Sequence, residues 1–134
     1  MKVISYNLRK HRAVVELEEL FAAHEPDILC LQEAETMSLP ARVGDLALAQ
    51  STTRNRLGLA VYYRDAMLRP TAVRAVALKK SMHDRVLRPA HERLVGVRFR
   101  ELTSGRDFIV ASFHAAPLTA LAQRSLKQGS RLSY

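Results

Sequence analysis

The sequence is poor in cysteine, and this scarcity excludes a disulfide framework. The one cysteine, Cys30, lies inside an apolar run from Ile28 to Leu31, so we expect a buried thiol and a reducing compartment. No stretch is long and apolar enough for a transmembrane helix, and the N-terminal segment lacks the apolar part of a signal peptide. These absences predict a cytoplasmic location.

Acidic residues are also in short supply. The chain has 13 Asp and Glu against 21 Lys and Arg, which gives a net charge of +8. Such an excess favours polyanions such as nucleic acid, phosphorylated lipids or a membrane surface. It is equally compatible with solubility alone, and the scattered arginines do not form a nucleic-acid-binding tail.

The first part of the chain predicts a βαβ unit. The segment Val3 to Asn7 begins with β-branched residues and is typical of a strand. Ala13 to His24 carries apolar residues at helical spacing, Pro26 ends that helix, and Ile28 to Gln32 forms the next strand. A right-handed crossover would make the two strands parallel.

The rest of the chain predicts mostly antiparallel structure. Its clearest feature is a hairpin whose two strands are joined by a turn at Ser104 and Gly105. The segment 79–92 is basic and indicates an exposed loop, and a final helix is expected at Ala120 to Gln128. The pattern is mixed α/β with helices on one face of a sheet. The expected strands are Leu46 to Ala49, Leu57 to Tyr63, Ala72 to Leu78, Arg93 to Leu102 and Arg106 to Phe113.

Three polar residues, Asn7, Glu33 and His114, lie at or directly after the carboxyl ends of predicted strands, where open α/β sheets bind ligands. The βαβ geometry places Asn7 beside Glu33, whereas the place of His114 depends on a strand order that the sequence leaves open. Their types suit phosphodiester cleavage. A carboxylate is a hard ligand for Mg²⁺, an amide can hold a metal-bound water or a phosphate oxygen, and a histidine can act as acid or base. Taken singly, each is more often a turn former, a solvated loop residue or a structural histidine.

Four segments occur in the order of known family motifs. They are Val3 to Asn7 (VISYN), Pro26 to Glu33 (PDILCLQE), Gly58 to Arg64 (GLAVYYR) and Phe108 to Pro117 (FIVASFHAAP). These segments resemble motifs of the endonuclease/exonuclease/phosphatase superfamily, whose fold is DNase I-like. The second is the most specific, and the His-Ala-Ala-Pro run in the last is similar to DNase I-type members.

The resemblance implies an α/β fold, the N-terminal part of a DNase I-like four-layer α/β sandwich, and a metal-dependent phosphodiesterase or nuclease that uses Mg²⁺ or Mn²⁺. By position, Glu33 would be a metal ligand and catalytic residue. Asn7 would be its neighbour at the metal or phosphate, and His114 the phosphate-contacting catalytic acid or base. Members of the DNase I type carry a Glu before the central strand that orients the histidine, whereas Arg56 to Gly58 contains no carboxylate here. The substrate stays open between nucleic acid and a small phosphoester, whether DNA, RNA, phospholipid or sugar phosphate.

The later family motifs, Gly-Asp-x-Asn and Ser-Asp-His, are absent, and no Asp or Glu follows Asp107. We therefore interpret residues 1–134 as a single, truncated domain of this type that is weakly active or inactive. If the second sheet were missing, an uncovered sheet face would favour self-association. The alternatives are a non-catalytic basic module that binds nucleic acid and a half-domain that depends on a partner.

Overall fold

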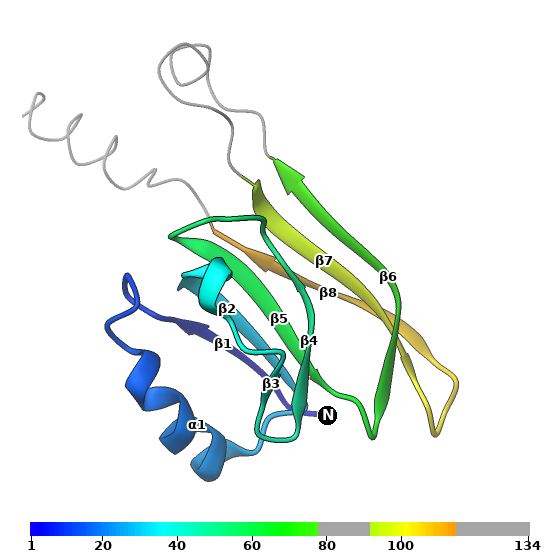
Figure 1. The fold of residues 1–134 in the computed structure, drawn as a ribbon. Coiled ribbons are helices and arrows are strands. Elements are labelled where there is room, and N and C mark those ends of the chain that lie inside the picture. Colours follow the sequence, from blue (N-terminus) through cyan, green and yellow to red (C-terminus); the bar gives the residue numbers. More distant parts are fainter. Residues whose placement is uncertain (78–91, 115–134) are drawn as a thin grey trace, which may run out of the picture.

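The computed structural model describes residues 1–77 and 92–114, which form a helix and two packed sheets (Figure 1). The strand order is β1-β2-β5-β4-β3 in the first sheet and β6-β7-β8 in the second. No helix within the described residues is long and apolar enough to cross a membrane. In chain order the elements are β1 (Val3–Asn7), the 3-10 helix η1 (Val14–Glu16), α1 (Leu17–His24), β2 (Ile28–Ala34), the 3-10 helix η2 (Thr36–Ser38), β3 (Arg42–Val43), β4 (Leu46–Ser51), β5 (Gly58–Arg64), β6 (Leu68–Ala77), β7 (Glu92–Glu101) and β8 (Asp107–Phe113).

The predicted βαβ unit is confirmed, because β1 and β2 pair in parallel on either side of α1. The connection becomes helical at Val14, but its first turn is the 3-10 helix η1, so α1 begins at Leu17 and not at the predicted Ala13. The helix ends where Glu25 adopts a left-handed conformation with φ of 42°. Pro26 follows and cannot continue the helix.

The predicted hairpin is also confirmed. β7 and β8 pair along their length without a register shift, and Gly105 has the positive φ of 70° that the turn requires. The three apolar residues that alternate with glycine and arginine along β7, Val95, Val97 and Phe99, are fully buried. Alternation therefore identified the inner face of this hairpin correctly.

Some elements depart from the expectation. β6 begins at Leu68 and not at Ala72. Pro70 interrupts the strand pattern in the sequence, but the strand continues through it with a register shift between Pro70 and Ala72. β3 and η2 were not predicted, since both are too short to show a periodic pattern. The predicted loop at 79–92 lies outside the described residues except for its last position, which begins β7, and the predicted helix at 120–128 lies outside them entirely.

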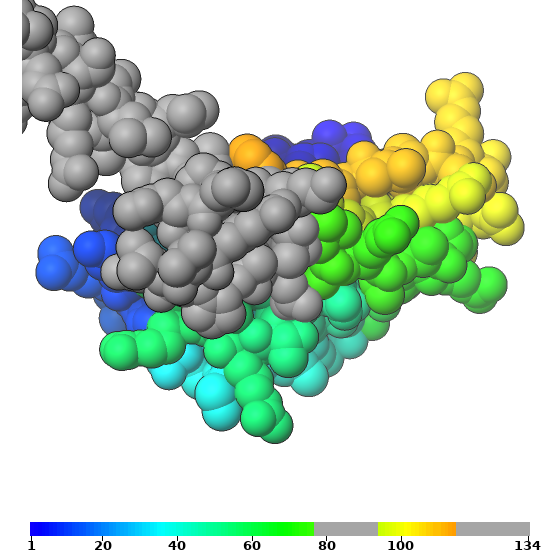
Figure 2. Space-filling view, turned by 90° about the horizontal axis from the view of Figure 1, so that it is seen from above, coloured from blue at the N-terminus to red at the C-terminus, as the bar shows by residue number. Residues whose placement is uncertain are grey.

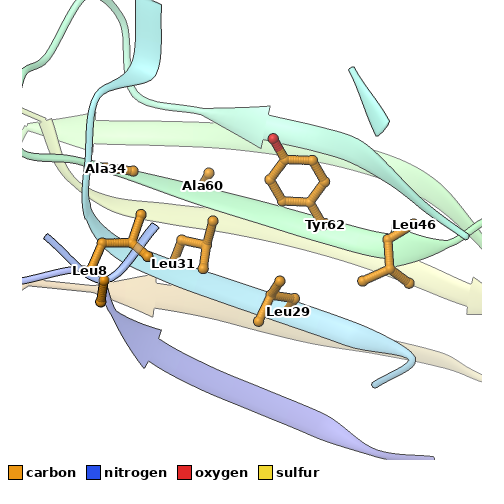
Figure 3. Packing of buried hydrophobic residues seen from close by; sticks show 8 residues of the cluster. Leu8, Leu29, Leu31, Ala34, Leu46, Ala60 and Tyr62 are labelled. Carbon is orange, nitrogen blue, oxygen red and sulfur yellow. The ribbon is translucent and has the colours of Figure 1, made fainter. Parts of the chain in front are cut away.

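One hydrophobic core joins α1 to the outer face of the first sheet. Leu29 and Leu31 of β2 and Tyr62 of β5 are fully buried and point to the same side (Figure 3). Leu17 and Phe21 of the helix region pack against them. Alternate residues of β1 and β2 are thus fixed against the helix, which leaves the intervening residues for the other face.

A second core fills the space between the two sheets. Ile28 and Cys30 of β2 meet Val97 and Phe99 of β7 there. The uncovered inner face was expected only if the second sheet were missing, and this condition is not met, because β6, β7 and β8 of the same chain cover that face. Burial also raises the pKa of the Cys30 thiol to about 11, so this thiol stays protonated and unreactive at neutral pH.

Candidate active site

The three polar residues singled out in the sequence lie together at one edge of the sandwich. Asn7 ends β1 opposite Gln32 of β2, and Glu33 follows Gln32. His114 follows β8, which packs over β2 from the second sheet. Glu33 Oε1 lies 3.5 Å from His114 Nε2. The strand order that the sequence left open thus brings the carboxyl ends of β1, β2 and β8 together.

A β-bulge positions Glu33. Its φ is 55°, and the register between β2 and β5 shifts between Leu31 and Ala34. A left-handed conformation at a residue other than glycine costs about 1–2 kcal/mol, and bulges beside functional sites commonly redirect a side chain. The carboxylate is held in this direction because Oε2 accepts a hydrogen bond of 2.7 Å from the backbone N–H of Lys10.

The loop after β1 supplies these backbone donors. Arg9, Lys10 and His11 have φ values of 50°, 58° and 71°, so three successive residues are left-handed. The N–H of Arg9 donates to Asn7 Oδ1 at 2.7 Å, while the N–H of Lys10 donates to Glu33. Adjacent amides of a strained loop therefore orient the side-chain oxygens of both residues.

Side-chain contacts also hold the loop after β1 in place. Arg9 Nη2 lies 2.6 Å from Glu16 Oε1, and the hydroxyl of Tyr6 also donates to Glu16. The hydrogen bond from Tyr6 holds the pKa of the Glu16 carboxyl below its usual range, and the same bond raises the pKa of Tyr6. The ring of His11 contacts the carbonyl oxygen of Arg56, which ties the loop to the segment before β5.

A buried glutamine connects the two sheets beneath the site, and sequence reasoning missed it. Gln32 Nε2 donates to Ser5 Oγ of β1 at 3.0 Å and to Ser112 Oγ of β8 at 3.1 Å. It also reaches the carbonyl oxygen of Cys30 at 3.3 Å. The sequence held a signal for this contact, because Gln32 and Ser112 are polar residues within otherwise apolar strands. A polar group buried in a sheet needs a hydrogen-bond partner.

Replacement of Gln32 by Leu should lower the free energy of unfolding by about 2 kcal/mol, because the buried hydroxyl of Ser112 loses this partner. Urea unfolding followed by circular dichroism measures the change. Gln50→Leu is the control, because Gln50 is half-buried on β4, on the far side of β5 from β2. Equal destabilisation by the two variants would contradict a specific role for the Gln32 bridge.

The donor atoms at this edge fit a hard divalent cation. Glu33 offers a carboxylate and Asn7 an amide oxygen, and the side chain of Glu33 is 19% exposed, so an ion can reach it. Mg²⁺ usually takes one or two carboxylates from the protein and keeps several waters. Residues 1–77 and 92–114 contain no group of three or more His, Cys, Asp or Glu that could hold an ion alone. A partly hydrated Mg²⁺ or Mn²⁺ fits this set.

The carboxylate beside His114 comes from β2 and not from the segment before β5. The segment Arg56 to Gly58, directly before and at the start of β5, contains no carboxylate. Within the described part of the chain, the carboxylate that pairs with His114 is Glu33. A Glu33 that binds a cation would therefore also set the orientation of the imidazole.

Comparisons with known proteins place this geometry in context. No family model matches the sequence, and no curated protein matches it either. The solved structure of the human Nocturnin catalytic domain with bound sulfate anion is similar, with a TM-score of 0.65 and 17% identity. D. rerio TDP2 complexed with single-strand DNA product has a TM-score of 0.70 and 15% identity, and D. rerio TDP2 humanized by 14 mutations has 0.70 and 14%.

The matches span most of this chain but about half of each neighbour. They cover 87% of the chain and 49% of the Nocturnin domain, and 98% of the chain and 52% and 54% of the two TDP2 chains. At 14–17% identity, the TM-scores of 0.65–0.70 show a shared fold. The chain therefore has the DNase I-like fold.

Proposed function

We propose that Asn7, Glu33 and His114 form the metal- and phosphate-binding part of a phosphodiesterase centre. The observation that carries this proposal is the approach of Glu33 and His114 to 3.5 Å from different sheets, at the edge where Asn7 ends β1. The DNase I-like fold, which is a fold of phosphoester hydrolases, supports it. Residues 1–134 would correspond to the N-terminal part of such a domain.

Each side chain has a distinct role in this proposal. Glu33 and Asn7 would hold Mg²⁺ or Mn²⁺, which polarises a phosphoryl oxygen when bound. The imidazole of His114, held in place by Glu33, would contact a non-bridging phosphate oxygen, where charge increases during hydrolysis. The backbone donors of Arg9 and Lys10 keep the oxygens of Asn7 and Glu33 in place, so binding requires little rearrangement.

Nucleic acid is the substrate class that the observations favour over a small phosphoester. The TDP2 structure contains single-strand DNA product, and the present chain has a net charge of +8. Arg9, Lys10 and Arg12 are exposed on the loop that follows Asn7, where they could contact neighbouring phosphates. The runner-up is a non-catalytic nucleic-acid-binding module. Salt-sensitive DNA binding that needs no metal would favour that alternative.

Binding of Mn²⁺ by the wild-type chain tests the proposed site. We expect the chain to reduce the electron paramagnetic resonance signal of free Mn²⁺, and Mg²⁺ to compete. Cleavage of single-stranded DNA or bis(p-nitrophenyl) phosphate should stay at background, because Glu33, the carboxylate described beside His114, would be occupied as metal ligand and could not serve as general base. Failure to bind Mn²⁺ would contradict the proposed site. Measurable cleavage that is lost in Glu33→Ala would contradict the expected inactivity.

A further inference from the structure

The two sheets of the sandwich are offset by one strand. β6 packs over β4, β7 over β5 and β8 over β2, whereas β1 lies one strand further out than β2. Figure 2 shows atoms of β8 in orange beside those of β1 in blue along this flank. Within residues 1–77 and 92–114, no strand pairs with the outer edge of β1 or of β8. A position one strand wide is therefore open beside β8 and opposite β1.

Exposed apolar side chains lie on both strands that border this open position, on the inner face of β1 and on the outer face of β8. Ile4 of β1 packs toward α1, so Val3 and Ser5 face the second sheet, and Val3 is 52% exposed. On β8, Ile109 is 73% exposed and Phe113 is 50% exposed. Neither strand has a Lys or a Pro, which natural proteins use to prevent pairing at a free edge. Both edges are therefore suited to pairing with a further strand.

We propose that two copies of the chain assemble about a two-fold axis that runs parallel to the strands and between the two layers. This rotation exchanges the layers, so β1 of each copy fills the position beside β8 of the other copy. Both sheets then continue across the axis. The carboxyl ends of β1, β2 and β8 lie at one edge, so each new β1–β8 pair is parallel.

The one-strand offset selects this arrangement over direct pairing of two β8 strands. A two-fold axis perpendicular to the sheets would place β8 of the second copy opposite β1. It would also bring β1 of the second copy onto the position that β2 already occupies. The layer-exchanging rotation avoids that clash, and its interface is self-complementary, as a two-fold interface must be.

The size of the assembly and the place of the site agree with this arrangement. Two copies have about the size of the solved neighbours, of which one copy matches 49% to 54%. A rotation parallel to the strands keeps the carboxyl ends at the same end of the assembly. If the proposed function is right, the dimer carries two such centres at that end, one on each side of the two β1 strands.

Sedimentation equilibrium of the full chain tests the assembly. We expect a dimer of twice the chain mass of 15.1 kDa. Val3→Lys should weaken dimerisation at least tenfold, because Val3 of the two copies would face each other at the axis. Val73→Lys is the matched control, since Val73 is 47% exposed on the free edge of β6, away from the axis. Ile109→Lys provides a second interface variant if Val3→Lys does not fold.

A mixing experiment makes the test specific. Val3→Lys and Val3→Glu chains should each be monomers alone and form a mixed dimer when combined, because opposite charges would then meet at the axis. A monomeric wild type, aggregates of undefined size, or a dimer that Val3→Lys and Ile109→Lys leave intact would each overturn the proposed assembly. A dimer that does not bind Mn²⁺ would contradict the proposed function and leave the assembly standing.

Discussion

Replacement of Glu33 by Gln should lower the affinity for Mn²⁺ by at least about tenfold, which corresponds to about 1.4 kcal/mol. Glu33 is the carboxylate at the centre of the site, and a neutral amide loses most of the attraction for a hard cation. The amide oxygen of Gln can still accept the hydrogen bond from the N–H of Lys10, so the loop should keep its conformation. Titration of the free Mn²⁺ resonance signal measures the affinity.

Glu35→Gln is the control for this experiment. Glu35 is exposed, lies two positions further along the chain and loses the same formal charge on substitution. We expect Glu35→Gln to bind Mn²⁺ like the wild type, and both variants to keep the wild-type melting temperature within a few degrees. Equal affinities of wild type and Glu33→Gln would remove the support for a metal site here. An equal loss in both variants would indicate a diffuse charge effect.

The sequence identified the candidate site residues but could not show that all three lie close together in the fold. Asn7 and Glu33 follow the two strands of a βαβ unit, whose geometry is local and places them side by side. His114 comes 81 positions after Glu33 in the numbering, and its place depends on how the second sheet packs on the first. That packing is set by long-range contacts which a single sequence pattern does not encode. The approach of His114 to Glu33 is therefore a finding of the structure, whereas the chemical roles of the three residues stay predictions.

The sequence also left open which surface the later strands would cover. Alternation marked Val95, Val97 and Phe99 as inward-facing, but it could not say which surface they would cover. In the structure they cover Ile28 and Cys30 of the first sheet. Val3 and Ile109 stay exposed on the edge strands β1 and β8, and periodicity could not show this, because edge and centre strands share the same alternation.

Backbone strain was the least predictable feature of the site. Nothing in the local sequence marks Glu33 or the three residues from Arg9 to His11 as left-handed, since none of them is glycine. These conformations exist because hydrogen bonds to Asn7 and Glu33, together with burial of the adjacent strands, outweigh a cost of about 1–3 kcal/mol per residue. The site geometry therefore depends on the stability of the surrounding sheet.

Replacement of Gly58 by Ala should lower the free energy of unfolding by about 3 kcal/mol, at the upper end of overpacking costs. A Cβ at Gly58 would lie 2.5 Å from Thr36 Cγ2 and 2.9 Å from Asn55 Cβ, with Thr52 Oγ1 closer still. These side chains cannot move freely. Thr52 Oγ1 accepts the N–H of Leu59 at 3.0 Å, and Thr36 Oγ1 accepts the N–H of Asn55 at 2.8 Å.

Gly96→Ala is the matched control, because a Cβ there would meet Leu94 Cδ2 at an ordinary 3.9 Å, and we expect a change within about 0.5 kcal/mol. Urea unfolding of both variants measures the difference. Gly58 pairs with Ala34, next to Glu33, so strain at Gly58 should also disturb the bulge that directs the carboxylate. Gly58→Ala should therefore weaken Mn²⁺ binding at temperatures where the chain is still folded. Equal stability of the two glycine variants would show that the loop before β5 yields more easily than its hydrogen bonds indicate.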